Sequence, residues 1–181
     1  MTFAELNESL EEVKARGPAC GLSEERKSIH FIWLIDCELG LTVQKNSGGH
    51  FEVYPTSRGS KTERIGVFPT ESDVYAYVHC YFKRDWDYAR WHGILVGQDH
   101  YLKDMLAQLK RRRIPASEYS FEGGMPKDCL CIGQNGEHWE VYYSDGEKKE
   151  NRGTFSRKKD AYDFLYYLVM KKYVKVKKLW W

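Results

Sequence analysis

His50-Phe51-Glu52-Val53-Tyr54 and His138-Trp139-Glu140-Val141-Tyr142 are two versions of one stretch, 88 positions apart. Each is followed by a polar loop and then by a Gly-x-Phe segment, at residues 66–68 and 153–155. A five-position apolar stripe at helical spacing comes next in both copies. The paired stripe residues are Val74 with Ala161, Tyr77 with Phe164, Val78 with Leu165, Tyr81 with Leu168 and Phe82 with Val169. The joint recurrence of strand, loop, glycine and stripe indicates an internal duplication.

The predicted fold class is α+β, with internally duplicated helix–β-hairpin/strand–helix units and an antiparallel sheet. We expect residues 1–98 to form the first unit together with a connection to the second. Residues 99–181 are expected to form the second unit and a C-terminal tail. A chain of 181 residues can bury a core without disulfides or metals.

Local signals predict the elements of the first unit. Thr2 and Glu5 form a capping box, and Thr70 is the N-cap of the repeated helix. The predicted strands are residues 29–35, the hairpin 41–43 with 51–54 across Asn46–Gly49, and residues 65–68. Residues 19–28 are expected to be a loop, and residues 84–98 the connection between the units.

The second unit is predicted in the same way. A helix begins near Asp99 and ends at Ile114-Pro115. A hairpin pairs residues 129–132 with 139–143 across Gln134-Asn135-Gly136-Glu137, where Asn-Gly is the strongest short hairpin signal, and a last strand at Thr154-Phe155 leads into the final helix. Lysines alternate with valines at 174–177, a pattern of a guarded edge strand.

Composition excludes several classes of protein. Net charge is only +2, although 30% of the residues are charged, which argues against bulk nucleic-acid affinity. Five cysteines without a C-x-x-C pair indicate reduced thiols and a cytoplasmic location, and we interpret Cys129 and Cys131 as small buried side chains. No apolar run is long enough to span a membrane, and no cofactor-binding or nucleotide-binding signature occurs.

The repeated stretch also supplies the candidate site. Alternation along a strand places Phe51 and Val53 in the core and leaves the His-x-Glu face, including Tyr54 and Tyr142, pointing outward. Paired His and carboxylate side chains can bind a metal or move protons, but a metal needs three or four converging ligands and no third ligand is apparent. We predict no catalytic residue and no metal ligand. The predicted partner-binding residues are His50, Glu52, Arg58, Lys61, Trp86, Trp91, His138 and Glu140.

Another charged segment allows two interpretations. Lys110-Arg111-Arg112-Arg113 closes the predicted third helix, where cations complement the helix dipole. The alternative is that this basic turn meets an acidic partner or a phosphate backbone.

The second copy resembles a known family. Gly-Glu-His-Trp-Glu-Val-Tyr-Tyr-Ser-Asp-Gly at 136–146, with Phe155-Ser156 and residues 161–165, resembles bacterial immunity proteins encoded beside polymorphic toxins. It is most similar to immunity factors of toxins like the tuberculosis necrotizing toxin, an NAD glycohydrolase. The resemblance covers about 60 residues of the second half, and residues 51–59 match more loosely.

The resemblance implies a cytoplasmic immunity protein that blocks a cognate toxin domain, for example an NAD-degrading one, by occluding its active site. Such a protein is not an enzyme and needs no cofactor. Two alternatives stay open from the residues themselves. One is a nucleic-acid-binding module shaped like RNA–DNA hybrid-binding domains, and the other is a hydrolase using His50 or His138. The oligomeric state is not determined by the sequence.

Overall fold

One mostly antiparallel sheet with helices packed against it makes up the described part of the chain. The computed structural model describes residues 1–6, 8, 20–25, 28–33, 39–57, 60–92 and 98–174. Ten described strands join in the order β1-β2-β3-β4-β6-β10-β9-β8-β7, and β5 pairs with β4 off this path. Only β7 and β8 run parallel. The α+β class and the mainly antiparallel sheet are therefore confirmed.

The described part of the first half carries six strands and a long helix. The strands are β1 (Cys20–Glu25), β2 (Ser28–Trp33), β3 (Leu39–Lys45), β4 (Phe51–Ser57), β5 (Ser60–Lys61) and β6 (Gly66–Phe68), and the helix is α2 (Glu71–His92). A helical turn at residues 3–6 precedes them. The predicted capping box is confirmed there, because Thr2 N donates to Glu5 Oε2 at 2.9 Å and Glu5 N donates to Thr2 Oγ1 at 3.2 Å.

The second half begins with α3 (Gln98–Arg111) and a short 3-10 turn, η1 (Ala116–Glu118). The strands β7 (Tyr119–Ser120), β8 (Cys129–Asn135), β9 (His138–Ser144) and β10 (Lys149–Phe155) follow, and α4 (Lys158–Val174) comes last. The first half contains β3, β4, β6 and α2 in this order, with β5 between β4 and β6, and the second half contains β8, β9, β10 and α4. The predicted edge strand at 174–177 falls almost wholly outside the described residues.

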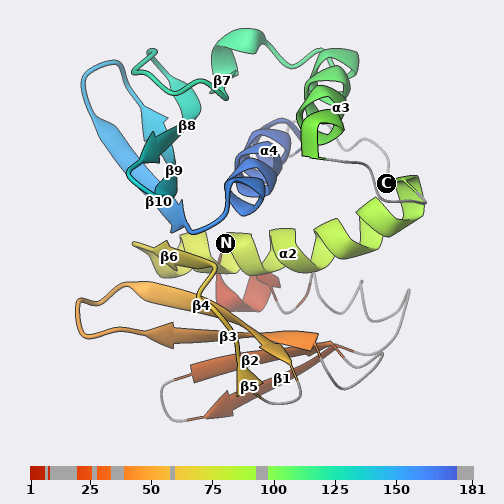
Figure 1. Cartoon of the computed structure of the whole chain (residues 1–181), viewed down its shortest axis with the longest axis vertical. Coiled ribbons are helices and arrows are strands. Elements are labelled where there is room, and N and C mark those ends of the chain that lie inside the picture. Colours follow the sequence, from red (N-terminus) through yellow and green to blue (C-terminus); the bar gives the residue numbers. More distant parts are fainter. Residues whose placement is uncertain are drawn as a thin grey trace.

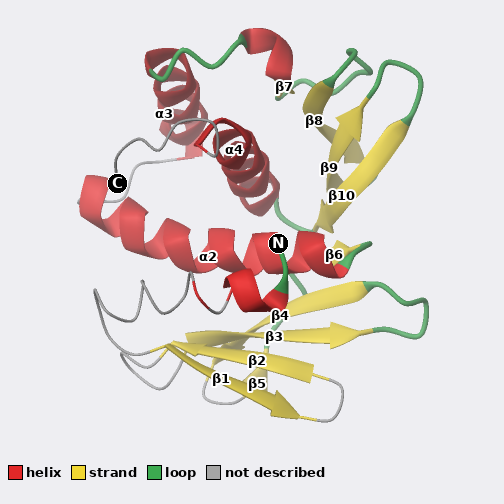
Figure 2. Cartoon of the chain, turned by 180° about the vertical axis from the view of Figure 1, so that it is seen from behind, coloured by secondary structure: helices red, strands yellow, loops and turns green. Residues whose placement is uncertain are grey.

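Figure 1 shows how the helices lie relative to the sheet. α2 crosses the middle of the molecule, with β1 to β5 on one side of it and α4, β8, β9 and β10 on the other. Figure 2 shows the same arrangement from behind, with α3 beside α4 and far from β1 and β2. The two halves of the sheet meet where β6 pairs with β10.

Two segments for which neither a helix nor a strand was predicted contain one. Residues 84–98 were expected to connect the units, but α2 continues to His92. The charged residues there do not break a helix, and the segment from 71 to 92 contains neither Gly nor Pro. Residues 20–25, expected in a loop, form β1, whose six positions all pair with β2. That pairing overrides the weak strand propensity of a polar, glycine-containing segment.

The two hairpins are confirmed, with one difference in the second turn. In the first, Asn46 N donates to His50 O and Gly49 N donates to Asn46 O, and Gly49 has φ 82°. In the second, Asn135 pairs with His138, so the two loop residues are Gly136 and Glu137 rather than Asn-Gly. Gly136, the first residue of this two-residue loop, has φ 60°, a backbone conformation that glycine adopts without strain.

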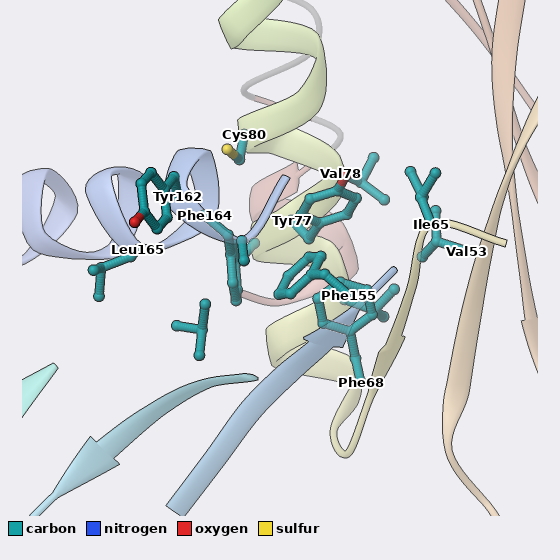
Figure 3. Packing of buried hydrophobic residues seen from close by; sticks show 14 of the residues in the cluster. Val53, Ile65, Phe68, Tyr77, Val78, Cys80, Phe155, Tyr162, Phe164 and Leu165 are labelled. Atoms are coloured by element: carbon teal, nitrogen blue, oxygen red, sulfur yellow. The ribbon is translucent and has the colours of Figure 1, made fainter. Parts of the chain in front are cut away.

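The core is centred on four aromatic rings, one from each of β6, α2, β10 and α4. Phe68, Tyr77, Phe155 and Phe164 are each 0% exposed. All six pairs of ring centroids lie 5.0–5.7 Å apart, within the usual range for tilted and edge-to-face aromatic contacts. Figure 3 shows these rings meeting between the two helices and the strand ends. Residues on both sides of the predicted boundary between 98 and 99 therefore belong to one shared core.

α3 ends in a Schellman motif whose left-handed residue is an arginine. Ile114 N donates to Leu109 O at 3.1 Å and Arg113 N donates to Lys110 O at 2.9 Å. Leu109 is 0% exposed and Ile114 is 6% exposed, so the buried pair anchors the turn to the core. Arg113 has φ 57°, the conformation that favours glycine at this position.

Candidate functional site

The candidate site lies on the outer face of the sheet, defined as the side away from α2 and α4. Buried Val53, Phe68, Phe155 and Val141 face the helices, so their neighbours along each strand face outward. Cross-strand register then places six residues in one row: Gln44, Glu52, Val67, Thr154, Glu140 and Gly133. Both glutamates of the repeated stretch stand in this row.

The row brings the two copies of the repeated stretch onto one surface. Val67 pairs directly with Thr154, and these two residues are the middle positions of the two similar Gly-x-Phe segments. Glu52 and Glu140 therefore stand on either side of this pair, three strand spacings or about 14 Å apart. The sequence places the two His-x-Glu pairs on different repeats, and strand pairing makes them parts of one face.

Glu52 is held by four side-chain donors. Its Oε1 accepts from Arg64 Nη1 at 2.6 Å and from Asn46 Nδ2 at 3.4 Å. Its Oε2 accepts from the Tyr54 hydroxyl at 2.8 Å and from Gln44 Nε2 at 3.3 Å. The Glu52 side chain is 12% exposed, whereas Arg64 is 42% exposed. The carboxylate is thus fixed in place with a solvent-facing guanidinium beside it.

These contacts set the charge of the site. The hydrogen bond from Tyr54, with those from Asn46, Gln44 and Arg64, lowers the pKa of Glu52 against the opposing effect of burial. Burial and the Glu52 carboxylate raise the pKa of the Tyr54 phenol, which stays neutral and donates. Lys61 Nζ adds a second cation, because it donates to Gln44 Oε1 at 2.5 Å and lies 5.3 Å from the centre of the Tyr54 ring.

Glu140, in the other copy, has a simpler environment. Asn135 Nδ2 donates to Glu140 Oε1 at 2.8 Å. The side chain is half-buried within β9. The outer face therefore pairs a heavily hydrogen-bonded glutamate with one that has a single side-chain donor among the described residues.

The prediction that Tyr142 points into solvent is wrong. Tyr142 does lie on the outer face, but it is 1% exposed, and its hydroxyl donates to Gly124 O at 2.7 Å. Gly124 belongs to the segment between β7 and β8, and Tyr142 packs with Cys129 and Cys131 in a small second cluster beside it. Sequence alternation assigns a face of a sheet, but it does not reveal that a distant loop folds over that face.

The two histidines do not converge. Phe51 pairs with Phe68, so His50 lies beyond the Phe68 end of β6. Trp139 pairs with Phe155, which pairs with Gly66, so His138 lies beyond the opposite end of β6. His50 and His138 are both exposed at hairpin turns. They are farther apart than the two glutamates and share no site.

The remaining predicted residues are placed unevenly. Lys61 joins the Glu52 network. Arg58 lies outside the described residues, and Trp86 and Trp91 are described only as backbone positions of α2. Sequence reasoning missed Gln44, Asn46 and Arg64. The predicted hairpin could have identified Gln44, because Gln44 lies opposite Glu52 on the neighbouring strand. Arg64 could not be identified in this way, because its contact with Glu52 depends on the path of the loop after β5.

Two other kinds of chemical group in the described residues are the buried cysteine thiols and the Asp73 carboxylate. Burial raises the pKa of the Cys131 thiol to about 12 and also raises that of Cys129, so neither is a nucleophile at neutral pH. No group of three or more His, Cys, Asp or Glu within the described ranges could hold a metal ion. Asp73 lines a groove of about 300 Å³ between α2 and α4, where Thr70 and Arg152 contact its two carboxylate oxygens.

Among the helices in the part of the chain that the structure describes, none is long and apolar enough to cross a membrane. Comparison with protein-family models, with curated proteins and with solved structures gave no match.

Proposed function

We propose that this chain is a cytoplasmic immunity protein that neutralises a cognate bacterial toxin domain by binding it and occluding its active site. The observation that carries the proposal is the outer-face row from Glu52 to Glu140. This row stands at the centre of a rigid sheet, and its charges are fixed before any partner arrives. Preorganised charges favour specific binding because little side-chain entropy is lost on association.

Binding suits this face better than catalysis. The ionised Glu52 is saturated by donors, so it is a poor general base, and the histidines that could move protons are far apart. A protein that only occludes an enzyme needs shape and charge, and both are supplied by a sheet face. The family resemblance of residues 136–146 and 161–165 points to the same class of function.

We also propose that the two halves arose by duplication of one β-β-β-α unit. The pairing of Val67 with its repeat equivalent Thr154 supports this origin. So do the core rings, because Phe68 and Tyr77 occupy the positions of Phe155 and Phe164 in the other copy. Equivalent residues meeting at one seam are expected where two copies pack about a two-fold axis.

The test is capture of the partner with three tagged baits from the source cell extract: the unmodified chain, Glu140→Arg and Glu147→Arg. Glu140 is half-buried in the row, and Glu147 is an exposed loop residue whose reversal changes net charge equally. We expect the unmodified and Glu147→Arg baits to retain one toxin domain at equal stoichiometry in high salt, and Glu140→Arg to release it. The purified domain should lose its enzymatic activity, NAD consumption for an NAD glycohydrolase, when the chain is added.

Two results would overturn the proposal. One is a captured enzyme that keeps full activity at saturating concentrations of this chain. The other is recovery of nucleic acid that washes off with salt, because that behaviour belongs to the nucleic-acid-binding alternative.

A further inference from the structure

The turn of the second hairpin contains a chemically reactive pair, Asn135-Gly136, which is the only Asn-Gly dipeptide in the sequence. Both residues are exposed. An asparagine that precedes glycine is prone to ring closure in water, because glycine has no Cβ to shield its backbone nitrogen from the side-chain amide. The pair also belongs to the outer face, because Asn135 Nδ2 donates to Glu140 Oε1 at 2.8 Å.

The contacts of the described asparagines set Asn135 apart. Asn46 and Asn151 each donate through Nδ2 and also accept a backbone N–H at Oδ1, so both ends of their side-chain amides are held. The structure shows a contact of Asn135 at Nδ2 alone. Serine follows Asn46 and arginine follows Asn151, and these side chains hinder approach to the backbone nitrogen that would have to react.

The attacking nitrogen is unengaged at this turn. Within the described residues Gly136 N donates to no acceptor, because it lies in the two-residue loop outside the ladder of β8 and β9. Asp145-Gly146 in the next turn could close the same ring. There Gly146 N donates to Ser144 Oγ at 3.2 Å, and Asp145 Oδ1 accepts from two backbone N–H groups. Both reacting groups are held at that turn, whereas Gly136 N is not.

We propose that Asn135 is a site of spontaneous deamidation, which removes the side-chain donor of Glu140 and puts a carboxylate in its place. A base takes the proton of Gly136 N, and this nitrogen attacks Asn135 Cγ. The new C–N bond closes a succinimide ring, while the Cγ–Nδ2 bond breaks and Nδ2 leaves as ammonia with the proton that the base returns. One water then opens the ring at either carbonyl, giving aspartate or isoaspartate.

The products change the outer face directly. A carboxylate at position 135 faces Glu140 in place of an amide donor, and like charges at this separation repel. Isoaspartate also routes the main chain through the side chain of the residue that closes the hairpin by pairing with His138. The reaction is independent of the proposed function, whereas any loss of toxin binding that follows from it rests on that function.

The experiment incubates the full chain in mildly alkaline buffer and follows each asparagine by peptide mapping with mass spectrometry. An isoaspartyl methyltransferase assay detects the isoaspartate product. Asn46 and Asn151 are internal controls. Asn135→Gln is the matched variant, because glutamine must close a larger ring and does so more slowly. A parallel sample in urea shows how the unfolded chain reacts.

We expect deamidation at Asn135 of the folded chain to be at least about tenfold faster than at Asn46 or Asn151. Isoaspartate at this position should be lost in Asn135→Gln. Equal rates at the three asparagines would overturn the proposal, and so would a reaction at Asn135 that occurs only in urea.

A second measurement tests the effect on Glu140. Asn135→Asp contains one product of the reaction, and Asn135→Ser removes the amide without adding a charge. We expect the urea midpoint of Asn135→Asp to lie below that of Asn135→Ser at neutral pH, and the gap to close in acid, where the carboxylates are protonated. Equal midpoints at neutral pH would show that the new charge does not act on Glu140 and would overturn that part of the proposal.

Discussion

Gly153→Ala should destabilise the protein, because the new methyl group would enter the aromatic core. A Cβ at Gly153 would lie 2.8 Å from Phe68 Cε1, 3.0 Å from Phe68 Cδ1 and 3.1 Å from Phe155 Cε2. Favourable carbon–carbon contacts are about 3.5–4.0 Å. Both rings are 0% exposed and packed against Tyr77 and Phe164, so they have no free space to move into.

Overpacking of this kind costs about 1–3 kcal/mol. Replacing glycine by alanine in a strand recovers about 0.5–1 kcal/mol through the unfolded chain. The midpoints of these two ranges give an expected net loss in the free energy of unfolding of about 1 kcal/mol. Gly66→Ala should cost less, because its nearest contact, Phe68 Cε2, is 3.1 Å away.

Urea unfolding followed by tryptophan fluorescence and circular dichroism measures the difference. Gly48→Ala is the control, since its Cβ would meet nothing closer than Asn46 Oδ1 at 3.4 Å. When Gly153→Ala is made in a Phe68→Leu background, the smaller leucine side chain should relieve most of the destabilisation by the new methyl group. A double-mutant cycle with these two substitutions measures that relief. A Gly153→Ala protein as stable as the unmodified chain, with an unchanged m-value, would refute the packing argument.

Three further changes test other parts of the structure. Arg113→Gly should raise the free energy of unfolding by about 1 kcal/mol, because glycine adopts the φ of 57° without strain; chemical denaturation checks this, and a loss of stability would contradict it. Glu52→Gln should lower stability by about 1 kcal/mol at pH 7, since a carboxylate with several donors is lost. The folded-state pKa of Glu52 lies below its ordinary value of 4.5, so this contribution is complete above that value and disappears as the pH falls through the folded pKa. Parallel denaturation curves across pH should converge at low pH, and a constant gap would show that Glu52 acts without its charge. Thr70→Ala should cost about 1 kcal/mol, because Thr70 Oγ1 accepts from Asp73 N at 3.1 Å and caps α2; Ser at the same position should restore most of it.

Local signals in the sequence predicted the local structure well. The capping residues Thr2 and Thr70 have the expected hydrogen bonds, and both hairpins form where the turn residues indicated. Each of these features depends on residues within a few positions of one another. The face of each repeated strand was also correct, because alternation is a local property.

Features that depend on distant contacts were missed. Tyr142 is buried because a segment 18 positions away folds over it. The relation between the two candidate glutamates depends on one register, that of β6 with β10. No local pattern encodes a register between strands of different units, so the sequence could name Glu52 and Glu140 but not place them on one row.

The pairing of β6 with β10 also has a consequence for the order of events during synthesis. Val67 and Thr154 are 87 positions apart, whereas each hairpin closes over a few residues. Loop closure therefore favours the hairpins forming first and the β6–β10 contact forming last. Until β10 leaves the ribosome, the β6 edge has no partner on that side, and unpaired edges invite association between nascent chains. Slow translation of the second half would lengthen that exposure, so the expression level of soluble protein should depend on elongation rate more than on the stability of the finished fold.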